Sequence, residues 1–508
     1  MADTFRKDTL DKDLSRVGEI EAATSAVNRP LVGVGIAFLF MVLVITLVSI
    51  GLSGSPAMIT IVAAAAIGAY MAMNIGANDV ANNVGPAVGA KAMTLGGALV
   101  IAAVCETAGA LIAGGDVVDT ISKGIVNPGD LADTHVFIAA MMAALIAAGL
   151  WVNLATAINA PASTTHSIVG GVMGGGIAAA GFSTVDWSVM GAIAASWVIS
   201  PVLGGLIAAF FLYLVKALIV YREDKIAAAR RWVPIFVAIM FGAFAAYLTM
   251  KGLKKIVTVD GAMIWMIGAT TFALSWAIFH PLIRSQSEGM ENRNQSLRKL
   301  FRIPLIISAA LLSFAHGAND VANAVGPLAA VVNATTADSV AAEVGIPLWV
   351  MLIGAAGISL GLLLFGPKLI RLVGSQITKL NPMRAFCVAL SAAITVIIAS
   401  WFGLPVSSTH IAVGAVFGVG FFREMWTSRS RRRRRYIAAR REASGGTSIN
   451  MKTSAQDRTV PPPSPEVVRQ RRLVRRAHVT TIGAAWVVTV PATAVMSAII
   501  FHILRAFV

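Results

Sequence analysis

Residues 76–86 read GANDVANNVGP, and residues 317–327 read GANDVANAVGP. Ten of the eleven positions are identical, and the two copies are 241 residues apart. Each copy follows a long apolar run, which places Asp79 and Asp320 at the depth of a membrane. An ionisable residue there costs about 2.5–3.5 kcal/mol on insertion scales, so it is a functional-site hypothesis by default. The duplicated string therefore predicts a site with two-fold character inside a membrane domain.

A second pair of strings supports the duplication. Residues 161–170 read PASTTHSIVG and residues 405–414 read PVSSTHIAVG, at a separation of 244. A single three-residue insertion therefore relates the two halves over this region. An internal repeat at a fixed separation indicates two structural units of the same kind.

The composition excludes an ordinary soluble domain. The chain has 508 residues, of which 57% are hydrophobic and only 13% charged. Such values are typical of proteins that span a membrane several times. Cys105 and Cys387 lie in apolar segments and imply no disulfide framework. Eight arginines at 429–441 supply much of the net charge of +16. A basic tract beside anionic lipid explains them, and we expect no nucleic-acid partner.

The placement of Lys and Arg predicts how the chain crosses the membrane. The linkers 216–232, 284–302 and 367–383 are basic and are expected inside, whereas 323–346 has no Lys or Arg and is expected outside. One loop, 251–262, violates the rule with three lysines. Counting segments of about 20 apolar residues then gives the two copies of the first string opposite orientations.

The expected fold is an all-α polytopic membrane protein, an inverted-topology repeat with discontinuous or re-entrant helices. The segments near 160–180 and 405–422 are Gly-rich and begin with Pro, which is typical of re-entrant or broken helices. The predicted organisation is a cytoplasmic tail at 1–30, an extra transmembrane helix at 31–52, a first inverted repeat at 57–215, a linker region with two transmembrane helices at 216–301, a second inverted repeat at 302–422, a basic disordered cytoplasmic linker at 423–478 and a C-terminal transmembrane helix at 479–508.

The first pair of strings suggests a cation site. Carboxylate and amide oxygens are hard ligands, suited to Na⁺, Mg²⁺ or a proton. Gly76, Gly85 and Pro86 follow the pattern of a helix that breaks and frees backbone groups. The alternative is that these residues are polar contacts between packed helices. The candidate residues are Asn78, Asp79, Asn82, Asn319, Asp320 and Asn323.

The second pair of strings suggests an anion site. A Pro followed by Ser and Thr is a helix N-terminus signal. The N–H groups and partial positive charge of such a terminus favour an anion, and hydroxyls add donors. The alternative is simple N-capping. His166 and His410 could carry protons. The candidate anion ligands are Ser163, Thr164, Thr165, Ser407, Ser408 and Thr409.

Both string pairs resemble those of the PiT family of inorganic phosphate transporters. The resemblance runs from about Ile59 to Phe422 and includes Glu106 in the string CETAG. It implies that the Asn/Asp strings, with Glu106, hold the coupling ion and that the Ser/Thr tracts hold phosphate. Sodium-coupled animal members carry a glutamate where this chain has Ala389, so the coupling ion stays open between H⁺ and Na⁺.

The resemblance implies a secondary active transporter for phosphate:cation symport in the cell (inner) membrane, and not an enzyme. No cofactor or resident metal is expected. The cargo is phosphate, free or as metal-phosphate, and a homodimer stays open. Two alternatives remain: a permease of the same fold for sulfate or another oxyanion, and an anion channel or receptor. The chain has no nucleophile–base pair, HExxH or phosphate-loop signature that would favour an enzyme.

Overall fold

The computed structural model of the chain describes residues 31–126, 131, 133–158, 162–252, 258–337, 346–376, 380–429 and 476–506. Within these ranges the chain is helical throughout its length, apart from short turns and an isolated β-bridge between Val126 and Val185. Eleven of the described helices are long and apolar enough to cross a membrane. The predicted all-α polytopic fold is confirmed. The predicted tail at 1–30 and most of the predicted basic linker lie outside the described residues.

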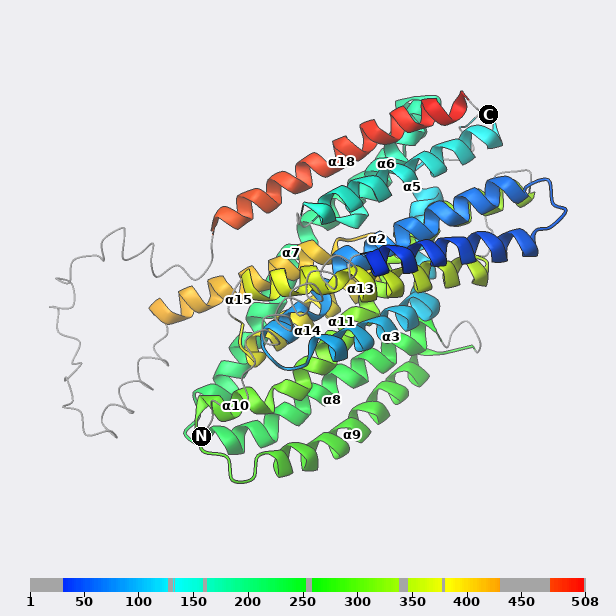
Figure 1. The fold of residues 1–508 in the computed structure, drawn as a ribbon. Helices are drawn as coiled ribbons and strands as arrows, with labels where there is room; N and C mark the ends of the chain where they lie inside the picture. The colour runs from blue at the N-terminus through cyan, green and yellow to red at the C-terminus, as the bar shows by residue number, and fades with distance from the viewer. Residues whose placement is uncertain are drawn as a thin grey trace, which may run out of the picture.

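The helices lie side by side along one common direction (Figure 1). The first half contains the helix Leu31–Gly51 and then α2 (Met58–Gly89), α3 (Leu95–Ala113), α4 (Gly115–Asp119), η1 (Thr120–Gly124), α5 (Thr134–Ala157), α6 (Thr164–Ala180) and α7 (Trp187–Val215), which continues as η4 (Lys216–Val220). The connecting part contains α8 (Lys225–Lys251), α9 (Gly261–Gln286) and α10 (Asn294–Leu300). The second half contains α11 (Arg302–Asp320), α12 (Ala322–Ala337), α13 (Leu348–Gln376), α14 (Pro382–Trp401), α15 (Ser408–Arg429) and α18 (Arg476–Arg505).

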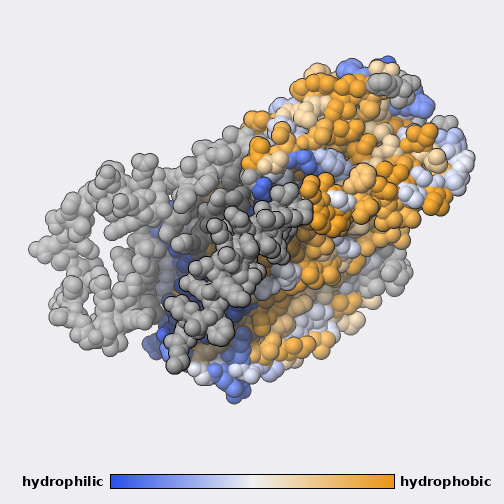
Figure 2. Space-filling view, viewed as in Figure 1, coloured by the Kyte–Doolittle hydropathy of each residue, from blue (hydrophilic) through white to orange (hydrophobic). Residues whose placement is uncertain are grey.

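The outer surface is apolar along the sides of the helices. Large side chains such as Trp265 and Ile59 are 79% and 78% exposed. Figure 2 shows hydrophobic residues over most of the described part of one face, with hydrophilic residues gathered toward the ends of the helices. Exposed apolar surface on this scale needs lipid rather than water as its solvent. The helices α6, with 17 residues, and α15 are not among the eleven candidate spans found in the described residues, and their re-entrant character stays a prediction.

The sequence prediction of a helix break at Gly85 and Pro86 is wrong. α2 continues through both residues to Gly89, and Pro327 likewise lies inside α12. Each proline leaves the carbonyl four residues earlier without its helical hydrogen bond, and that carbonyl belongs to Asn82 in α2 and to Asn323 in α12. The only interruption near either string is at Val321, a single turn residue between α11 and α12.

The glycine that opens each string has a different function from the predicted one. A Cβ at Gly76 would collide with the carbonyl oxygen of Ile358 in α13. A Cβ at Gly317 would collide with the carbonyl oxygen of Glu106 in α3. Small residues allow helix backbones to approach closely inside a membrane. Each Gly therefore brings its string against a neighbouring helix.

Contacts at successive turns give the direction of the central helices. α2 is parallel to α13, and α3 is antiparallel to α13. The continuous stretch α11–α12 is parallel to the stretch from α3 to η1. The two copies of the first string therefore lie on helices that run in opposite directions. The contacts are Met73–Gly361 and Val80–Gly366 for α2 with α13, Leu99–Gly366 and Thr107–Ser359 for α3 with α13, and Glu106–Gly317 and Ile121–Gly326 for α3–η1 with α11–α12.

The second pair of strings lies at the tips of two helical hairpins. α5 and α6 run antiparallel, because Gly175 packs on Ala140 and Gly171 on Ala144. The bridge between Val126 and Val185 closes the base of this hairpin. α14 packs in the same way on α15. The two tips touch, since the hydroxyl of Thr165 donates to the backbone carbonyl of Val406 at 2.9 Å.

The final helices of the two halves are exchanged. α7 packs on α15 and α14, whereas α18 packs on α6 and α5 (Figure 1). Gly414 approaches the carbonyl of Pro201 in α7, and the equivalent Gly170 approaches the carbonyl of Val490 in α18. α18 therefore follows the second hairpin in sequence as α7 follows the first, and each of these helices packs on the hairpin of the other half. From the sequence alone α18 had no such counterpart, because neither helix carries a repeated string.

Candidate functional site

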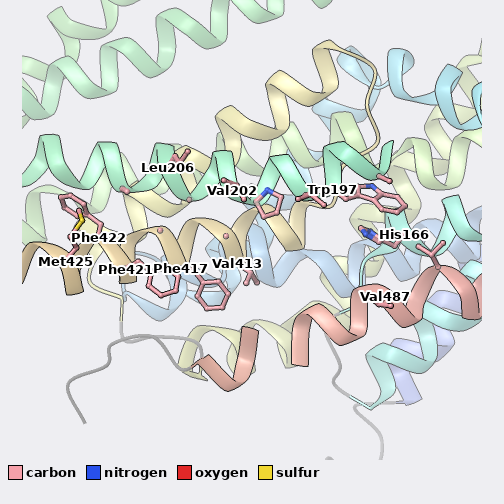
Figure 3. A pocket seen from close by; sticks show the side chains of 18 of the residues that line it. His166, Trp197, Val202, Leu206, Val413, Phe417, Phe421, Phe422, Met425 and Val487 are labelled. Atoms are coloured by element: carbon pink, nitrogen blue, oxygen red, sulfur yellow. The ribbon is translucent and has the colours of Figure 1, made fainter. Parts of the chain in front are cut away.

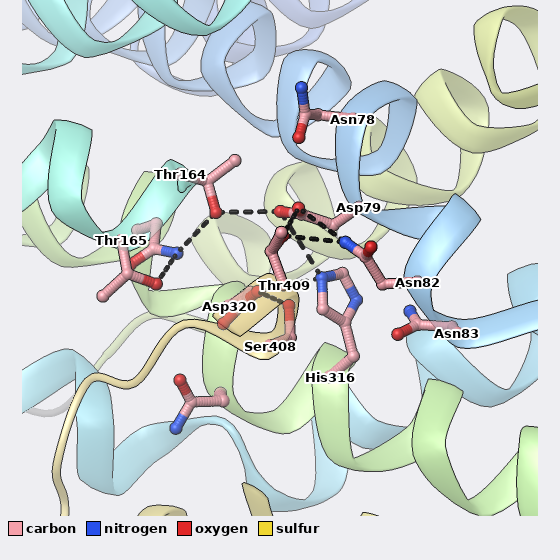
Figure 4. Close-up of polar contacts among 12 residues, drawn as sticks. Asn78, Asp79, Asn82, Asn83, Thr164, Thr165, His316, Asp320, Ser408 and Thr409 are labelled. Carbon is pink, nitrogen blue, oxygen red and sulfur yellow. Dashed lines mark hydrogen bonds and ion pairs between the residues drawn. The ribbon is translucent and has the colours of Figure 1, made fainter. Parts of the chain in front are cut away.

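The two pairs of strings meet at the centre of the bundle, as Figure 4 shows. Asp79 projects from the middle of α2 and is 1% exposed. Its Oδ2 accepts a hydrogen bond from Thr164 at 2.9 Å, and its Oδ1 accepts one from Thr409 at 3.0 Å. Thr164 lies at the start of α6 and Thr409 at the start of α15, so one carboxylate joins both hairpin tips.

Asp320 ends α11 and is also 1% exposed. Its Oδ2 accepts from the hydroxyl of Ser408 at 3.1 Å. This contact is the equivalent of the one between Thr164 and Asp79, because Ser408 and Asp320 follow those residues by 244 and 241 positions. Each aspartate is thus bonded to the hydroxyl of the hairpin in its own half.

The second Asn of each string reaches across to the other half. Asn82 donates to Thr409 at 2.8 Å, and Asn323 donates to Thr165 at 3.2 Å. Asn82 is the one partly exposed member of the set, whereas Asn323 and Thr165 are buried. These cross contacts link α2 with α15 and α12 with α6.

The first Asn of each string contacts the bend of a hairpin, and the amide of Asn78 also lies 3.2 Å from Oδ1 of Asp79. Asn78 lies 3.0 Å from the hydroxyl of Thr156 in α5. Asn319 donates to Ser400 in α14 at 2.9 Å and accepts from the backbone N–H of Val406 at 3.3 Å. Both residues therefore position the hairpin tips.

The first Ser of each tract is a helix cap. Ser163 accepts from the backbone N–H of His166 at 3.1 Å, and Ser407 accepts from that of His410 at 3.3 Å. The N-capping alternative therefore holds for these two residues, and the following two hydroxyls of each tract are the ones that face the aspartates and asparagines. His166 and His410 lie with ring centroids 4.4 Å apart, and His166 also stacks on Trp197.

A charged cluster occupies one side of the site only. Nε2 of His316 lies 2.9 Å from Asp320 and 3.8 Å from Asp79, and its Nδ1 lies 3.3 Å from Oε2 of Glu106. Asn83 donates to the other carboxylate oxygen of Glu106 at 2.8 Å. Three carboxylates therefore surround one fully buried imidazole. Glu106, which the resemblance implied for this site, is in contact with it.

His316 and Asn83 were missed by sequence reasoning. Each replaces an apolar residue of the other half: His316 corresponds to Ile75, and Asn83 corresponds to Ala324. Asn83 is the single mismatch between the two strings, and His316 directly precedes the second string. A polar or ionisable residue on an apolar helix is a signal in its own right. His316 and Asn83 were missed because the two halves were compared only for identical residues.

The cluster has the donor set for a small cation. Asp79, His316 and Asp320 offer ligand atoms that all lie within 4.8 Å of one another. Among the described residues, three buried side-chain oxygens around the site have neither a hydrogen-bond nor an ion-pair partner: Oδ1 of Asn83, Oδ1 of Asp320 and Oδ1 of Asn323. Buried acceptors without donors favour a cation or a proton, and oxygen ligands suit hard cations such as Na⁺.

The site is closed to solvent. Apart from Asn82, the candidate residues are buried, from Thr165 at 0% exposed to Asn78 at 5%. A polar centre of this size inside a helical membrane protein, at the meeting point of two hairpins from two related halves, is typical of a secondary transporter in an occluded state. The fold and the site therefore define a multi-pass membrane transporter.

Comparison with known proteins gives the family. Residues 75–497 match the phosphate transporter family, so the chain belongs to that family and is a transporter rather than an enzyme. The match reaches into α18, well beyond Phe422, where the resemblance in the sequence ended.

Relatives cover nearly the whole chain. A protein of Helicobacter pylori strain J99 named "Putative phosphate permease" is 45% identical over 96% of this chain and 98% of its own length. A relative from Pyrococcus abyssi with a name of the same kind is 36% identical over 70% of this chain and 87% of its own length. The solved structure titled "The sodium-dependent phosphate transporter" is 33% identical, with a TM-score of 0.76 over 88% of this chain and 100% of that one.

Proposed function

We propose that this chain moves inorganic phosphate across the cell membrane by symport with a cation. Phosphate is the cargo of the family, and a sodium-dependent transporter has the same fold. The observation that carries the proposal is the meeting of two hydroxyl-bearing helix N-termini at a pair of buried aspartates. Thr164 and Ser408 each stand at the start of a helix and each donate to an aspartate.

The helix N-termini supply the attraction for phosphate. The positive ends of α6 and α15 point into the same centre from opposite halves, with hydroxyls that can turn from a carboxylate to an anion. Thr164, Thr165, Ser408 and Thr409 are the proposed phosphate ligands, and Ser163 and Ser407 hold the helix starts that bear them. No lysine or arginine is needed for such a cradle.

The aspartates explain why a cation must accompany phosphate. A dianion beside Asp79, Asp320 and Glu106 in a buried site would be strongly repelled, because a buried charge without a partner costs several kcal/mol. A cation held at Asp79 and Asp320, which with His316 offer ligand atoms within 4.8 Å of one another, would offset that repulsion. Phosphate and the cation would then enter the site together. This is thermodynamic coupling of the kind that symport requires.

The two halves are proposed to be inverted repeats. The antiparallel directions of α2 and α11–α12, the paired hairpins and the exchange of α7 and α18 support this arrangement. Alternating access would then consist of one half rocking against the other around the touching tips of the hairpins. We place the basic ends of α10 and α14 in the cytoplasm, following the distribution of Lys and Arg.

Uptake by the purified chain in proteoliposomes tests this function. Labelled phosphate should accumulate only when an inward Na⁺ or H⁺ gradient is imposed, and an excess of sulfate should not compete. Ser408→Ala should weaken uptake. Ser308→Ala is the matched control, because that buried hydroxyl bonds within its own helix to the carbonyl of Leu305. Preferred competition by sulfate would favour the oxyanion alternative, and gradient-independent flux would favour a channel.

A further inference from the structure

A basic pocket lies at the end of the bundle where α14 begins. It has a volume of about 220 Å³ and draws its cations from η4, α10, α14 and α15. Arg384 lies sixteen residues before Ser400, which contacts the transport site, so the pocket is about 24 Å from it along α14. The polar side chains that line the pocket are Lys216, Arg298, Arg384, Arg423, Asn294 and Asn381.

Several positively charged side chains lie close together in this pocket. Arg298 and Arg423 both lie close enough to Arg384 to repel its guanidinium. Glu424 lies beside Arg423, and the pocket is lined by four cationic side chains. Arg384 and Arg423 are partly buried, so water screens their repulsion less than at an open surface. Such a pocket favours an anion that several guanidinium groups can share.

Two features hold the pocket in a form that suits an anion. Nζ of Lys216 stands 5.1 Å from the ring centre of Phe422 and 5.7 Å from that of Trp426, which fixes its ammonium group at the edge of the pocket. Asn381 caps α14 by accepting from the backbone N–H of Arg384 at 3.1 Å. The positive end of a 20-residue helix therefore adds to the charge of the side chains.

A long apolar groove begins beside this pocket. It lies between α7, α15 and α18 and has a volume of about 1140 Å³. Figure 3 shows it extending from His166 at one end to Met425 at the other, with Val202, Leu206 and Phe417 along its walls. From Val413 to Met425 the groove follows twelve residues of α15, or about 18 Å. One leaflet of a bilayer has a hydrocarbon depth of about 15 Å.

The groove and the basic pocket meet at Lys216, which lines the pocket and stands 5.1 Å from the ring centre of Phe422, which lines the groove. Gly205 and Ala209 line the groove, and Leu212 and Lys216 line the pocket. These residues follow one another at helical spacing, so they form a single face of α7 that runs from apolar to basic.

On α15, Phe422 and Met425 line the end of the groove, and Arg423, on another face of the helix, lines the pocket. The occupant that fits both parts is amphipathic, with an anionic head and an apolar tail. Arg prefers phosphate because its planar group can donate two hydrogen bonds at once.

We propose that this chain binds an anionic phospholipid, with the lipid phosphate in the pocket of Arg298, Arg384 and Arg423 and an acyl chain in the groove between α7, α15 and α18. The arginine pocket is separate from the transport site, although the groove ends at His166, next to Thr165, and the proposal does not depend on the proposed function. It would fix the position of α15, whose first residues carry Ser408 and Thr409.

Native mass spectrometry of the delipidated full chain with added lipid tests the site. Phosphatidylglycerol should bind at least about tenfold more tightly than phosphatidylcholine, because phosphatidylcholine has the same phosphate but adds a choline cation that the four cations of the pocket repel. The double variant Arg384→Gln, Arg423→Gln should lose this preference, and Arg384→Lys, Arg423→Lys should keep most of it. Lys299→Gln is the matched control, because Lys299 is a cation of α10 that does not line this pocket.

A second variant tests the tail. Leu206→Trp should fill the groove and weaken phosphatidylglycerol binding, whereas Leu274→Trp, at a similarly exposed position on α9, should not. Equal binding of phosphatidylcholine and phosphatidylglycerol by the unaltered chain would overturn the proposal even if the variants failed to fold. Displacement of the lipid by millimolar inorganic phosphate would make the pocket a free-anion site. A change from dimer to monomer in Leu206→Trp would assign the groove to a second copy instead.

Discussion

The hydroxyl of Thr409 in α15 donates a hydrogen bond of 3.0 Å to Oδ1 of Asp79 in α2, across 330 residues of sequence. The same carboxylate accepts from Thr164 of the other hairpin at 2.9 Å. The carboxylate of Asp79 is therefore hydrogen-bonded to both hairpin tips. An anionic substrate that took a hydrogen bond from either hydroxyl would change the environment of the Asp79 carboxylate. In the proposed symport, this contact would couple phosphate to the cation.

The first prediction concerns the two aspartates. Asp79→Asn and Asp320→Asn should each reduce gradient-driven phosphate accumulation to the level of empty liposomes, because a neutral amide cannot offset a cation. Asp260→Asn is the control: Asp260 is the exposed N-cap of α9, and Asn caps a helix equally well. Uptake and insertion should be measured on the same preparations. Normal accumulation by both site variants would show that the carboxylates do not hold the coupling ion.

The second prediction concerns the hydroxyl that spans the halves. Thr409→Ala should raise the half-saturating phosphate concentration about 10- to 150-fold, since a hydrogen bond to a charged group contributes about 1.5–3 kcal/mol. Thr395→Ala, which removes a buried hydroxyl bonded within α14, should leave it unchanged. The measurement is initial uptake rate against phosphate concentration at a fixed gradient. An unchanged half-saturation in Thr409→Ala would remove this residue from the phosphate cradle.

The third prediction concerns His316. Replacing it by Gln leaves Asp79, Glu106 and Asp320 together without the imidazole that lies between them. Removing one partner of a buried ion pair costs about 3–5 kcal/mol, so the midpoint of thermal unfolding in detergent should fall. Adding Glu106→Gln to His316→Gln should restore part of the loss, because it removes one of the repelling charges. Additive losses in the double variant would argue against direct interaction between the two residues.

The sequence was informative where the two halves agree. The separations of 241 and 244 made Asp79 equivalent to Asp320 and Thr164 equivalent to Ser408, and in the structure these equivalent residues make equivalent contacts. The cross contacts of Asn82 and Asn323 could not be predicted, because they depend on how the two hairpins meet in space. A repeat defines which residues are equivalent, but not which of them touch.

The sequence predictions were wrong or incomplete where the two halves differ, and where the close packing of helix backbones determines the role of a residue. His316 and Asn83 occur in one half only, so a comparison of repeats passed over them. Gly76 was interpreted as a helix breaker from its backbone freedom. Its neighbour in α13 shows that its lack of a side chain is what matters. α18 carries no repeated string, and only its packing on α6 shows its equivalence to α7.

The fourth prediction follows from that packing. Gly76→Val and Gly317→Val should each prevent folding or sharply reduce the yield of inserted protein, because their side chains would meet backbone carbonyls that cannot move aside. Overpacking of a tight core costs about 1–3 kcal/mol and sometimes more. Gly191→Val in α7 is the control, since nothing lies within 4 Å of a Cβ at that position. Fluorescence-detected size exclusion of the three variants would compare them directly. Similar profiles for all three would mean that the helices can separate at little cost.

The fifth prediction concerns the direction of the repeats. Single cysteines at Ser55 and Thr336 should react with a membrane-impermeant thiol reagent applied outside intact cells, in a chain that lacks Cys105 and Cys387. A cysteine at Glu288 should not react. Ser55 precedes α2, Thr336 lies at the end of α12, and Glu288 lies before α11 at the opposite end of that helix pair. Because α2 and α11–α12 run in opposite directions, the start of α2 and the end of α12 belong on one side of the membrane. Repeats of the same direction would instead label Ser55 together with Glu288. Labelling of Glu288 alone would keep the inversion but reverse the whole molecule, and would place the arginine pocket of α14 and α15 outside the cell.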